Sequence, residues 1–244
     1  MRILYLIYQW LIAYPLLIVI TIITSLMVII GSILGSRDFW GYYPPMFWAR
    51  CFFCILFIPT ETRGRENIDK NTSYIFVANH QGAFDIFLIY GYLGHNFKWM
   101  MKQSLKKIPF VGTACQYAGH ILVDRTSRTS IRQTMQQAAK TLRGGMSMVV
   151  FPEGTRSKDG RLQRFKRGAF SLAEDLSLPV VPITIDGAFH LMPKGGLNVH
   201  PRKVTLTIHK PILPPSEGKY DMEALIKESY NSIASALPGE KPME

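Results

Sequence analysis

The chain has 244 residues and a formal net charge of +11 at pH 7. This length suits one domain with an attached segment, and a basic balance favours an anionic partner such as nucleic acid, a phospholipid surface or a phosphorylated substrate. The three cysteines do not suggest a disulfide framework. Cys51 and Cys54 have the spacing of half a zinc site, but the sequence has no second pair to complete one, so we interpret them as small apolar residues.

The N-terminal part differs in composition from the rest of the chain. Residues 1–60 contain only four charged side chains, and residues 3–36 contain none. This run is longer than the apolar core of a signal peptide, and as one straight helix it would extend about 50 Å, against a hydrocarbon layer of about 30 Å. We therefore expect one strongly tilted span or a helix broken inside the membrane, with Pro15, Gly31 and Gly35 as possible break points.

A second apolar segment covers residues 51–59 and is too short to span a membrane. Aromatic residues that could lie at headgroup depth precede it, namely Trp40, Tyr42, Tyr43, Phe47 and Trp48. We predict that residues 1–60 form a two-helix membrane anchor and that residues 61–244 form a basic globular domain. The alternative is a buried core hairpin, which the length of the uncharged run disfavours.

After residue 60, runs typical of strands alternate with stretches typical of helices. Strands are predicted at residues 74–78, 97–101, 120–123, 148–151, 180–185 and 204–208. Helices are predicted at residues 84–93, 128–143, 168–177 and 221–237. This alternation predicts an α/β domain with a central, mostly parallel or mixed sheet that is flanked by helices.

The segment NHQGAFD, at residues 79–85, follows the first of these strands. His80 and Asp85 can meet if His80 lies in the turn after the strand and Asp85 lies in the first helical turn, with Gly82 helping the backbone through. Asp85 would then accept a hydrogen bond from one ring nitrogen and leave the other as a base. Sites of this kind collect beyond the carboxyl ends of strands in α/β sheets. The spacing by itself equally allows a helix-capping Asp85 beside an unrelated loop histidine.

A second segment, FPEGTR at residues 151–156, also follows a predicted strand. Arg156 could bind a phosphate through two parallel hydrogen bonds, and Glu153 could orient Arg156 or a neighbour. The next residues add further basic side chains, namely Lys158, Arg161, Arg164, Lys166 and Arg167. Such a loop is ordinary by itself, but beside a histidine at a strand end it indicates an anion site.

Two more segments, GHILVDR at residues 119–125 and LPVVPITI at residues 178–185, are weak signals individually. In this order, NHQGAFD, GHILVDR, FPEGTR and VVPITI resemble the four motif blocks of the glycerolipid acyltransferases, most of all the bacterial 1-acyl-glycerol-3-phosphate acyltransferases. MMKQSLKKIPFVG, FKRGAF and MPKG are smaller matches, and the resemblance covers roughly residues 70–215. One departure is Gly82, where many members of the family have a serine.

The resemblance implies transfer of a fatty acyl group from a thioester donor to the sn-2 hydroxyl of 1-acyl-glycerol-3-phosphate (lysophosphatidic acid), giving phosphatidic acid. His80 would be the general base and Asp85 would hold its tautomer. Substrate-binding residues would be Lys102, Arg125 and Arg156 at the acceptor phosphate, with Glu153, Gly154 and Thr155 around the acceptor. The other motif positions are Asn79, Gly119, Phe151, Pro152, Lys166, Gly168 and Pro182.

No metal or cofactor is expected, since acyl-CoA or acyl carrier protein would be the co-substrate. The expected location is a bacterial inner membrane, with the catalytic domain on the cytoplasmic side. Three alternatives remain open: the same transfer to another lysolipid, a non-catalytic membrane-anchored protein that binds anionic lipid or nucleic acid, and a hydrolase that uses water in place of the acceptor. The sequence contains no nucleic-acid-binding motif, so we expect no nucleic acid partner.

Overall fold

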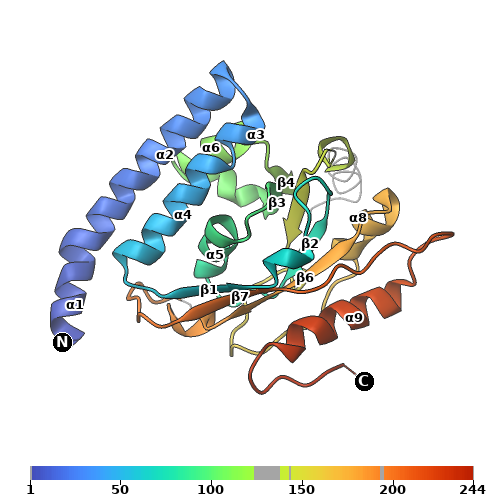
Figure 1. Cartoon of the computed structure of the whole chain (residues 1–244). Helices are drawn as coiled ribbons and strands as arrows, with labels where there is room; N and C mark the ends of the chain where they lie inside the picture. Colours follow the sequence, from blue (N-terminus) through green and yellow to red (C-terminus); the bar gives the residue numbers. More distant parts are fainter. Residues whose placement is uncertain (1, 124–137, 143, 193–194, 244) are drawn as a thin grey trace.

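The centre of the molecule is a seven-stranded sheet (Figure 1), seen in a computed structural model that describes residues 2–123, 138–142, 144–192 and 195–243. The strands are β1 (Thr60–Arg63), β2 (Ile75–Ala78), β3 (Phe97–Lys102), β4 (Ile121–Val123), β5 (Ser147–Val150), β6 (Val180–Asp186) and β7 (Val204–Ile208). They are arranged in the order β1-β7-β6-β2-β5-β3-β4, and every neighbouring pair is parallel except β6 and β7. The predicted α/β fold with a mixed, mostly parallel sheet is confirmed.

The central strands send alternate side chains into two separate cores. In β2, Phe76 and Ala78 belong to the core shared with the N-terminal helices. Ile75 and Val77 belong to the opposite core, which contains residues of α8 (Gly168–Leu176) and α9 (Met222–Ser235). Because both faces of β2 are buried, the strand is apolar throughout, as expected for a central strand of a covered parallel sheet.

The structure adds elements that the sequence did not predict. Strand β1 lies at the sheet edge, where its sequence TETR carries charges that hide the strand pattern. Between β3 and β4 lie a short 3₁₀ helix, η3 (Gln103–Lys107), and α6 (Val111–Tyr117). Of the helix predicted at residues 128–143, residues 138–141 are helical, and residues 128–137 and 143 lie outside the described residues.

The chain begins with a continuous helix made of α1 (Arg2–Tyr8), the π-helical turn η1 (Gln9–Ala13) and α2 (Tyr14–Leu34). With 33 residues and a stretch of mean hydropathy 2.8, it is long and apolar enough to cross a membrane. It runs through Pro15 and Gly31 and ends at Gly35, so only the last of the three expected break points interrupts it. The wide turn η1 directly before Pro15 accommodates the missing backbone N–H.

The helix has a glycine at position 31 because the side chain of another residue packs directly against its backbone there. A Cβ atom at this position would lie 2.1 Å from the ring of Trp40, in the short helix α3 (Arg37–Trp40). The glycine therefore lets the turn after α2 fold back against the helix, and the chain continues into α4 (Tyr43–Ile55).

Helix α4 is only 13 residues long, and its buried residues Pro45, Ala49 and Phe53 face the protein. Ala49 and Phe53 share one core with Leu17 of α2 and Phe76 of the sheet. In the part of the chain that the structure describes, one helix has the length and composition of a membrane span, and α4 is too short for one, as expected for the second apolar segment. The domain boundary at residue 60 stays a prediction, and the hydrophobic core continues across it.

Buried Asn79 connects two neighbouring strands beyond the end of β2. Its side-chain amide donates to the carbonyl of Ile185 at 2.8 Å, and its carbonyl accepts from the amide of Ile185 at 2.7 Å. We predict that Asn79→Ala lowers the free energy of unfolding by about 2 to 4 kcal/mol, because it leaves two buried backbone groups unpaired. Urea unfolding would measure this, with Asn71→Ala at an exposed turn as the control that changes stability by less than about 0.5 kcal/mol. Equal effects of the two changes would contradict this role of Asn79.

Candidate active site

His80 and Asp85 are in direct contact at the carboxyl end of β2. His80 lies in the loop after the strand, and Asp85 is in the first turn of α5 (Phe84–Tyr92), as the sequence predicted. His80 Nδ1 lies 2.7 Å from Asp85 Oδ2, and the same oxygen accepts from the backbone amides of Gln81 at 2.6 Å and Gly82 at 2.8 Å. The carboxylate therefore orients the imidazole and also closes the loop before α5. Since α5 has no side-chain cap and His80 contacts Asp85 directly, the structure shows the paired arrangement and not the capping alternative. Because Nδ1 is engaged, Nε2 is the imidazole nitrogen that can accept a proton.

The two side chains differ in exposure. Asp85 is fully buried, whereas the side chain of His80 is 16% exposed. The second carboxylate oxygen, Oδ1, is buried and has no hydrogen-bond partner among the described residues. All three donors therefore converge on Oδ2, which fixes its position relative to the imidazole.

The FPEGTR loop holds the backbone of His80 from both sides. Glu153 Oε1 accepts from the His80 amide at 2.8 Å, and the amide of Ser157 donates to the His80 carbonyl at 2.8 Å. Gln163 Nε2 donates to the other oxygen of Glu153 at 2.9 Å. Of the two roles considered for Glu153, the structure supports the orientation of a neighbour. The sequence analysis missed Gln163, which lies unmarked among basic residues in RLQRFK.

An aromatic ring fixes the plane of the imidazole. Phe151 stacks on His80 with a centroid distance of 3.9 Å and an interplanar angle of 10°. The ring centroid of Phe151 also lies 5.5 Å from that of Trp99, at an interplanar angle of 23°. The first residue of FPEGTR therefore positions His80 through its ring, a role that the sequence pattern did not reveal.

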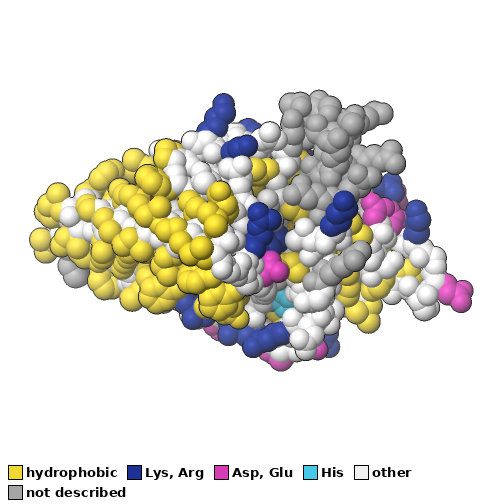
Figure 2. Space-filling view, turned by 90° about the horizontal axis from the view of Figure 1, so that it is seen from above, with side chains coloured by type: hydrophobic (Ala, Val, Ile, Leu, Met, Phe, Trp, Pro, Cys, Tyr) yellow, Lys and Arg dark blue, Asp and Glu magenta, His cyan; other side chains and the backbone are white. Residues whose placement is uncertain are grey.

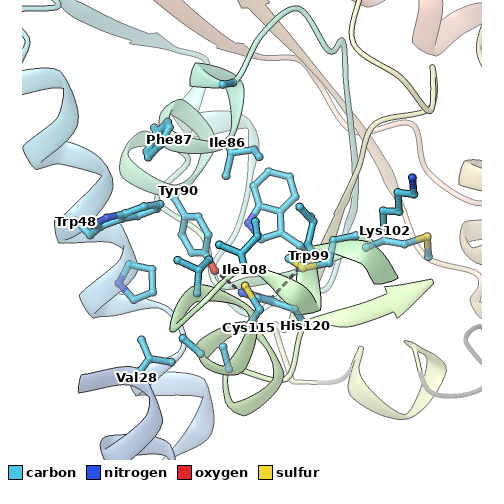
Figure 3. Close-up of a pocket in the computed structure, with 18 of the residues that line it drawn as sticks. Val28, Trp48, Ile86, Phe87, Tyr90, Trp99, Lys102, Ile108, Cys115 and His120 are labelled. Atoms are coloured by element: carbon cyan, nitrogen blue, oxygen red, sulfur yellow. Dashed lines mark hydrogen bonds between the residues drawn. The ribbon is translucent and has the colours of Figure 1, made fainter. Parts of the chain in front are cut away.

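The imidazole lies in the wall of a cavity of about 490 Å³. Helices α2, α4, α5 and α6 and the ends of β3 and β5 contribute the wall, which is mostly apolar (Figure 3). Its labelled apolar residues include Trp48, Phe87 and Ile108, and the cavity is large enough for a hydrocarbon chain.

One polar pair interrupts this apolar wall. Tyr90 Oη and His120 Nε2 lie 2.6 Å apart, and the amide of Trp99 donates to His120 Nδ1 at 3.3 Å (Figure 3). Burial lowers the pKa of His120 to about 3, so this histidine is neutral, and its Nε2–H donates to the tyrosine oxygen. His120 is therefore a satisfied core histidine and not a second base.

The structure brings only some of the other predicted residues to this cavity. Lys102, at the end of β3, and Gly154 line it together with His80. Thr155 and Arg156 are exposed in the loop after β5 and do not belong to the cavity wall as described. Arg125 lies outside the described residues.

The remaining motif residues have positions in the scaffold. The amide of Lys166 donates to the carbonyl of Pro152 at 2.9 Å, which closes the loop after β5. Gly168 begins α8, Gly119 precedes β4 with a φ of 78°, and Pro182 lies in β6 beside Val77. Among the residues that the structure describes, no group of three or more His, Cys, Asp or Glu side chains could hold a metal ion; the expected absence of a metal or cofactor stays a prediction.

Comparison with known proteins agrees with this arrangement. The sequence model of the Acyltransferase family matches residues 59–186, a range that includes His80, Asp85 and the FPEGTR loop. The chain belongs to the acyltransferase family. A solved structure of the 1-acyl-sn-glycerophosphate (LPA) acyltransferase PlsC from Thermotoga maritima is similar to this family member, with a TM-score of 0.74, 30% identity and coverage of 93% of each chain.

Two curated relatives extend the comparison. The chain is 36% identical over 195 residues to a 1-acyl-sn-glycerol-3-phosphate acyltransferase of Chlamydomonas reinhardtii, covering 79% of this chain and 57% of the relative. It is 37% identical over 183 residues to the chloroplastic 1-acyl-sn-glycerol-3-phosphate acyltransferase LPAT1 of Arabidopsis thaliana, covering 74% of this chain and 50% of the relative. The family member described here therefore spans about half the length of these curated relatives.

Because the carboxyl of Glu153 is buried, we expect the stability of the protein to depend on pH. Burial raises the pKa of Glu153 from 4.5 to about 7, against the opposing effect of its hydrogen bonds. A raised carboxyl pKa means that the folded state binds the proton more tightly than the unfolded state, so stability falls as pH rises from about 4.5 to about 7. We predict that Glu153→Gln reduces this loss by up to about 3 kcal/mol.

Urea unfolding of the wild type and Glu153→Gln at pH 5 and pH 8 would measure this difference. The control is Glu217→Gln at an exposed position, which keeps the pH dependence of the wild type. A wild type and a Glu153→Gln variant with the same pH dependence would contradict the raised pKa.

Proposed function

We propose that this protein transfers an acyl group from a thioester donor to the free hydroxyl of 1-acyl-glycerol-3-phosphate and so forms phosphatidic acid. The observation that carries the proposal is His80, whose Nδ1 is fixed by Asp85 and whose ring lies in the wall of an apolar cavity. The printed names of the relatives support the choice of acceptor, since they are 1-acyl-sn-glycerol-3-phosphate acyltransferases.

In this proposal His80 Nε2 removes the proton from the acceptor hydroxyl as the hydroxyl oxygen attacks the thioester carbonyl. The developing imidazolium is stabilised by Asp85 at 2.7 Å from Nδ1. When the tetrahedral intermediate collapses, the carbon–sulfur bond breaks, and the imidazolium returns the proton to the departing thiolate. The new ester and the free thiol balance the reaction, and no metal or cofactor is required.

The acceptor phosphate needs cationic partners near the cavity. Lys102 lies in the cavity wall and can provide one cation. Arg156 lies in the loop after β5, whose other residues bind the backbone of His80, and it can bind the phosphate through two parallel hydrogen bonds. Arg125 keeps the same proposed role on the basis of the sequence resemblance alone. Glu153, Gly154 and Thr155 would act by shaping the loop between these cations and the base.

The apolar helix Arg2–Leu34 supports a membrane location, which suits a lipid acceptor and a lipid product. We propose that the active site lies at the membrane surface, where a water-soluble donor can reach it. The relatives include chloroplastic plant proteins, so the bacterial inner membrane and the cytoplasmic orientation remain proposals. Both acyl-CoA and acyl carrier protein are retained as donors, and no nucleic acid partner is proposed.

The first test is the effect of His80 and Asp85 on acyl transfer. We predict that His80→Ala lowers kcat by about 10²- to 10⁴-fold, because the general base is lost. Asp85→Asn should also lower kcat, because an amide oxygen in the position of Oδ2 can keep the three hydrogen bonds but carries no negative charge to stabilise the imidazolium that forms. Labelled acyl transfer to 1-acyl-glycerol-3-phosphate from acyl-CoA and from acyl carrier protein, with the purified full chain, would measure both.

His190→Ala is the matched control, because His190 is exposed and lies outside the cavity wall. Thermal unfolding should show that all three variants are folded. Full activity of a folded His80→Ala variant would show that His80 is not the general base. Release of free fatty acid without acceptor would favour a hydrolase instead.

The second test concerns the phosphate. We predict that Arg156→Ala raises KM for the acceptor by about 10- to 100-fold, because charge-assisted hydrogen bonds contribute roughly 1.5 to 3 kcal/mol. Arg156→Lys should recover only part of this loss, since lysine keeps the charge but not the fork of donors. The control is Arg202→Ala at another exposed basic position. If KM responds equally to changes at residues 156 and 202, the effect is general electrostatics, and Arg156 does not bind the phosphate.

A further inference from the structure

The segment from Lys102 to Phe110 is exposed at every residue, although it contains several large apolar side chains. The exposed fractions of Leu105, Ile108 and Phe110 are 37%, 44% and 48%. Lys106 and Lys107 lie between these apolar residues, in the last turn of η3. Apolar side chains that protrude beside lysines are typical of segments that lie in the interface of an anionic membrane.

The backbone at Phe110 gives an independent reason to expect a function. Phe110 has φ 60° and ψ −55°, and the amide of Val111 donates to the carbonyl of Pro109 at 2.6 Å, which makes a γ-turn centred on Phe110. This turn is rare and strained for a bulky L residue. Strain of this kind is maintained mostly at functional sites, and here it accompanies an aromatic ring that is turned outward and not into the core.

The position of the segment connects it to the cavity. Lys102, Leu105 and Ile108 line the cavity that contains His80, so the exposed segment forms part of its mouth. The segment continues into α6, which packs against α2 through Ala114 and Val28.

The exposed apolar surface of the N-terminal helices extends from there. Along α1, η1 and α2 it includes Ile3, Leu4, Leu11, Ile23, Met27, Ile30 and Leu34. Figure 2 shows hydrophobic side chains gathered on the side of the molecule that the N-terminal helices form, with Lys and Arg at the border. The exposed segment and the apolar helix surface are thus neighbours through α6.

We propose that residues 102–110 form a second lipid-contact segment, in which Leu105, Ile108 and Phe110 enter the surface of an anionic bilayer and Lys106 and Lys107 contact headgroup phosphates. The mouth of the cavity then opens within the lipid layer, so that a lipid can pass from the bilayer to His80 without crossing water. The contact itself does not depend on the reaction; only the identity of the entering lipid as the acceptor rests on the proposed function.

The experiment measures the depth of a spin label in the full chain in vesicles. The native cysteines at positions 51, 54 and 115 are replaced by alanine, and one new cysteine carries a nitroxide, either in Ile108→Cys or in the control Leu213→Cys. Leu213 is 69% exposed and lies after β7, outside the cavity wall. Thermal unfolding of the labelled proteins shows whether they are folded. A labelled Phe110→Cys variant provides a second position if Ile108→Cys does not fold.

In vesicles that contain anionic phospholipid, the label at position 108 should be more accessible to dioxygen than to a water-soluble nickel chelate, and the label at position 213 should show the reverse. Equal exposure of both labels to the chelate would overturn the proposal. A label at position 108 that is protected from both reagents would also overturn it, because that result indicates a protein partner.

The lysines provide the second measurement. In the labelled Ile108→Cys protein, Lys106→Gln and Lys107→Gln should each lower the equilibrium constant for insertion by about fivefold in anionic vesicles. In zwitterionic vesicles they should have little effect. An equal effect in both kinds of vesicle would show that headgroup charge is not recognised. An inserted label, together with a wild-type chain that transfers no acyl group, would support the contact and count against the proposed function alone.

Discussion

The contact on which the active site depends is the convergence of three donors on Asp85 Oδ2. His80 Nδ1 and the amides of Gln81 and Gly82 all lie within 2.6 to 2.8 Å of this one oxygen. The carboxylate is fully buried at the start of α5, so it cannot rotate out into solvent. The loop that carries His80 is therefore positioned by the carboxylate. The position of the imidazole is therefore determined by the meeting of β2 and α5, and not by the flexibility of the loop.

A second set of contacts ties His80 and its loop to the neighbouring loop after β5. Its amide and carbonyl are bonded to Glu153 and Ser157, and its ring is stacked on Phe151. These three residues come from the loop after β5, which is the neighbour of β2 in the sheet. Parallel pairing brings the carboxyl ends of both strands to one edge. Two loops about 70 residues apart in sequence thus hold one residue in place. Because the pKa of Glu153 is raised by burial, the contact between these loops depends on pH.

The N-terminal helices are part of the site and also carry much of the exposed apolar surface. Residues of α2 and α4 line the same cavity as His80, and Leu17 and Phe53 lie in the same core as the sheet. Removal of residues 1–60 would therefore open the cavity and expose one face of the sheet. A helix that is long and apolar enough to cross a membrane thus forms part of the wall of this apolar cavity.

The α/β class and most of the strands could be predicted from the sequence, because they follow from local patterns. The pairing of His80 with Asp85 was one of two arrangements that their spacing allowed. Continuous apolar runs mark buried strands, and a histidine after a strand can reach an aspartate in the next helical turn. The sequence also identified the long apolar helix, but α4, whose buried face becomes clear only in the packed structure, appeared as a shorter piece of a separate anchor.

The residues that support the base became visible only in the folded chain. Gln163 lies 83 positions after His80 and reaches it through Glu153. Phe151, in the loop after β5, stacks on Trp99 of β3. Such partners depend on strand order, which determines which carboxyl ends are adjacent, and no local pattern encodes that order. The exposed apolar segment around Ile108 was equally hidden, because apolar residues in a sequence indicate burial, and only packing shows which of them the core leaves outside.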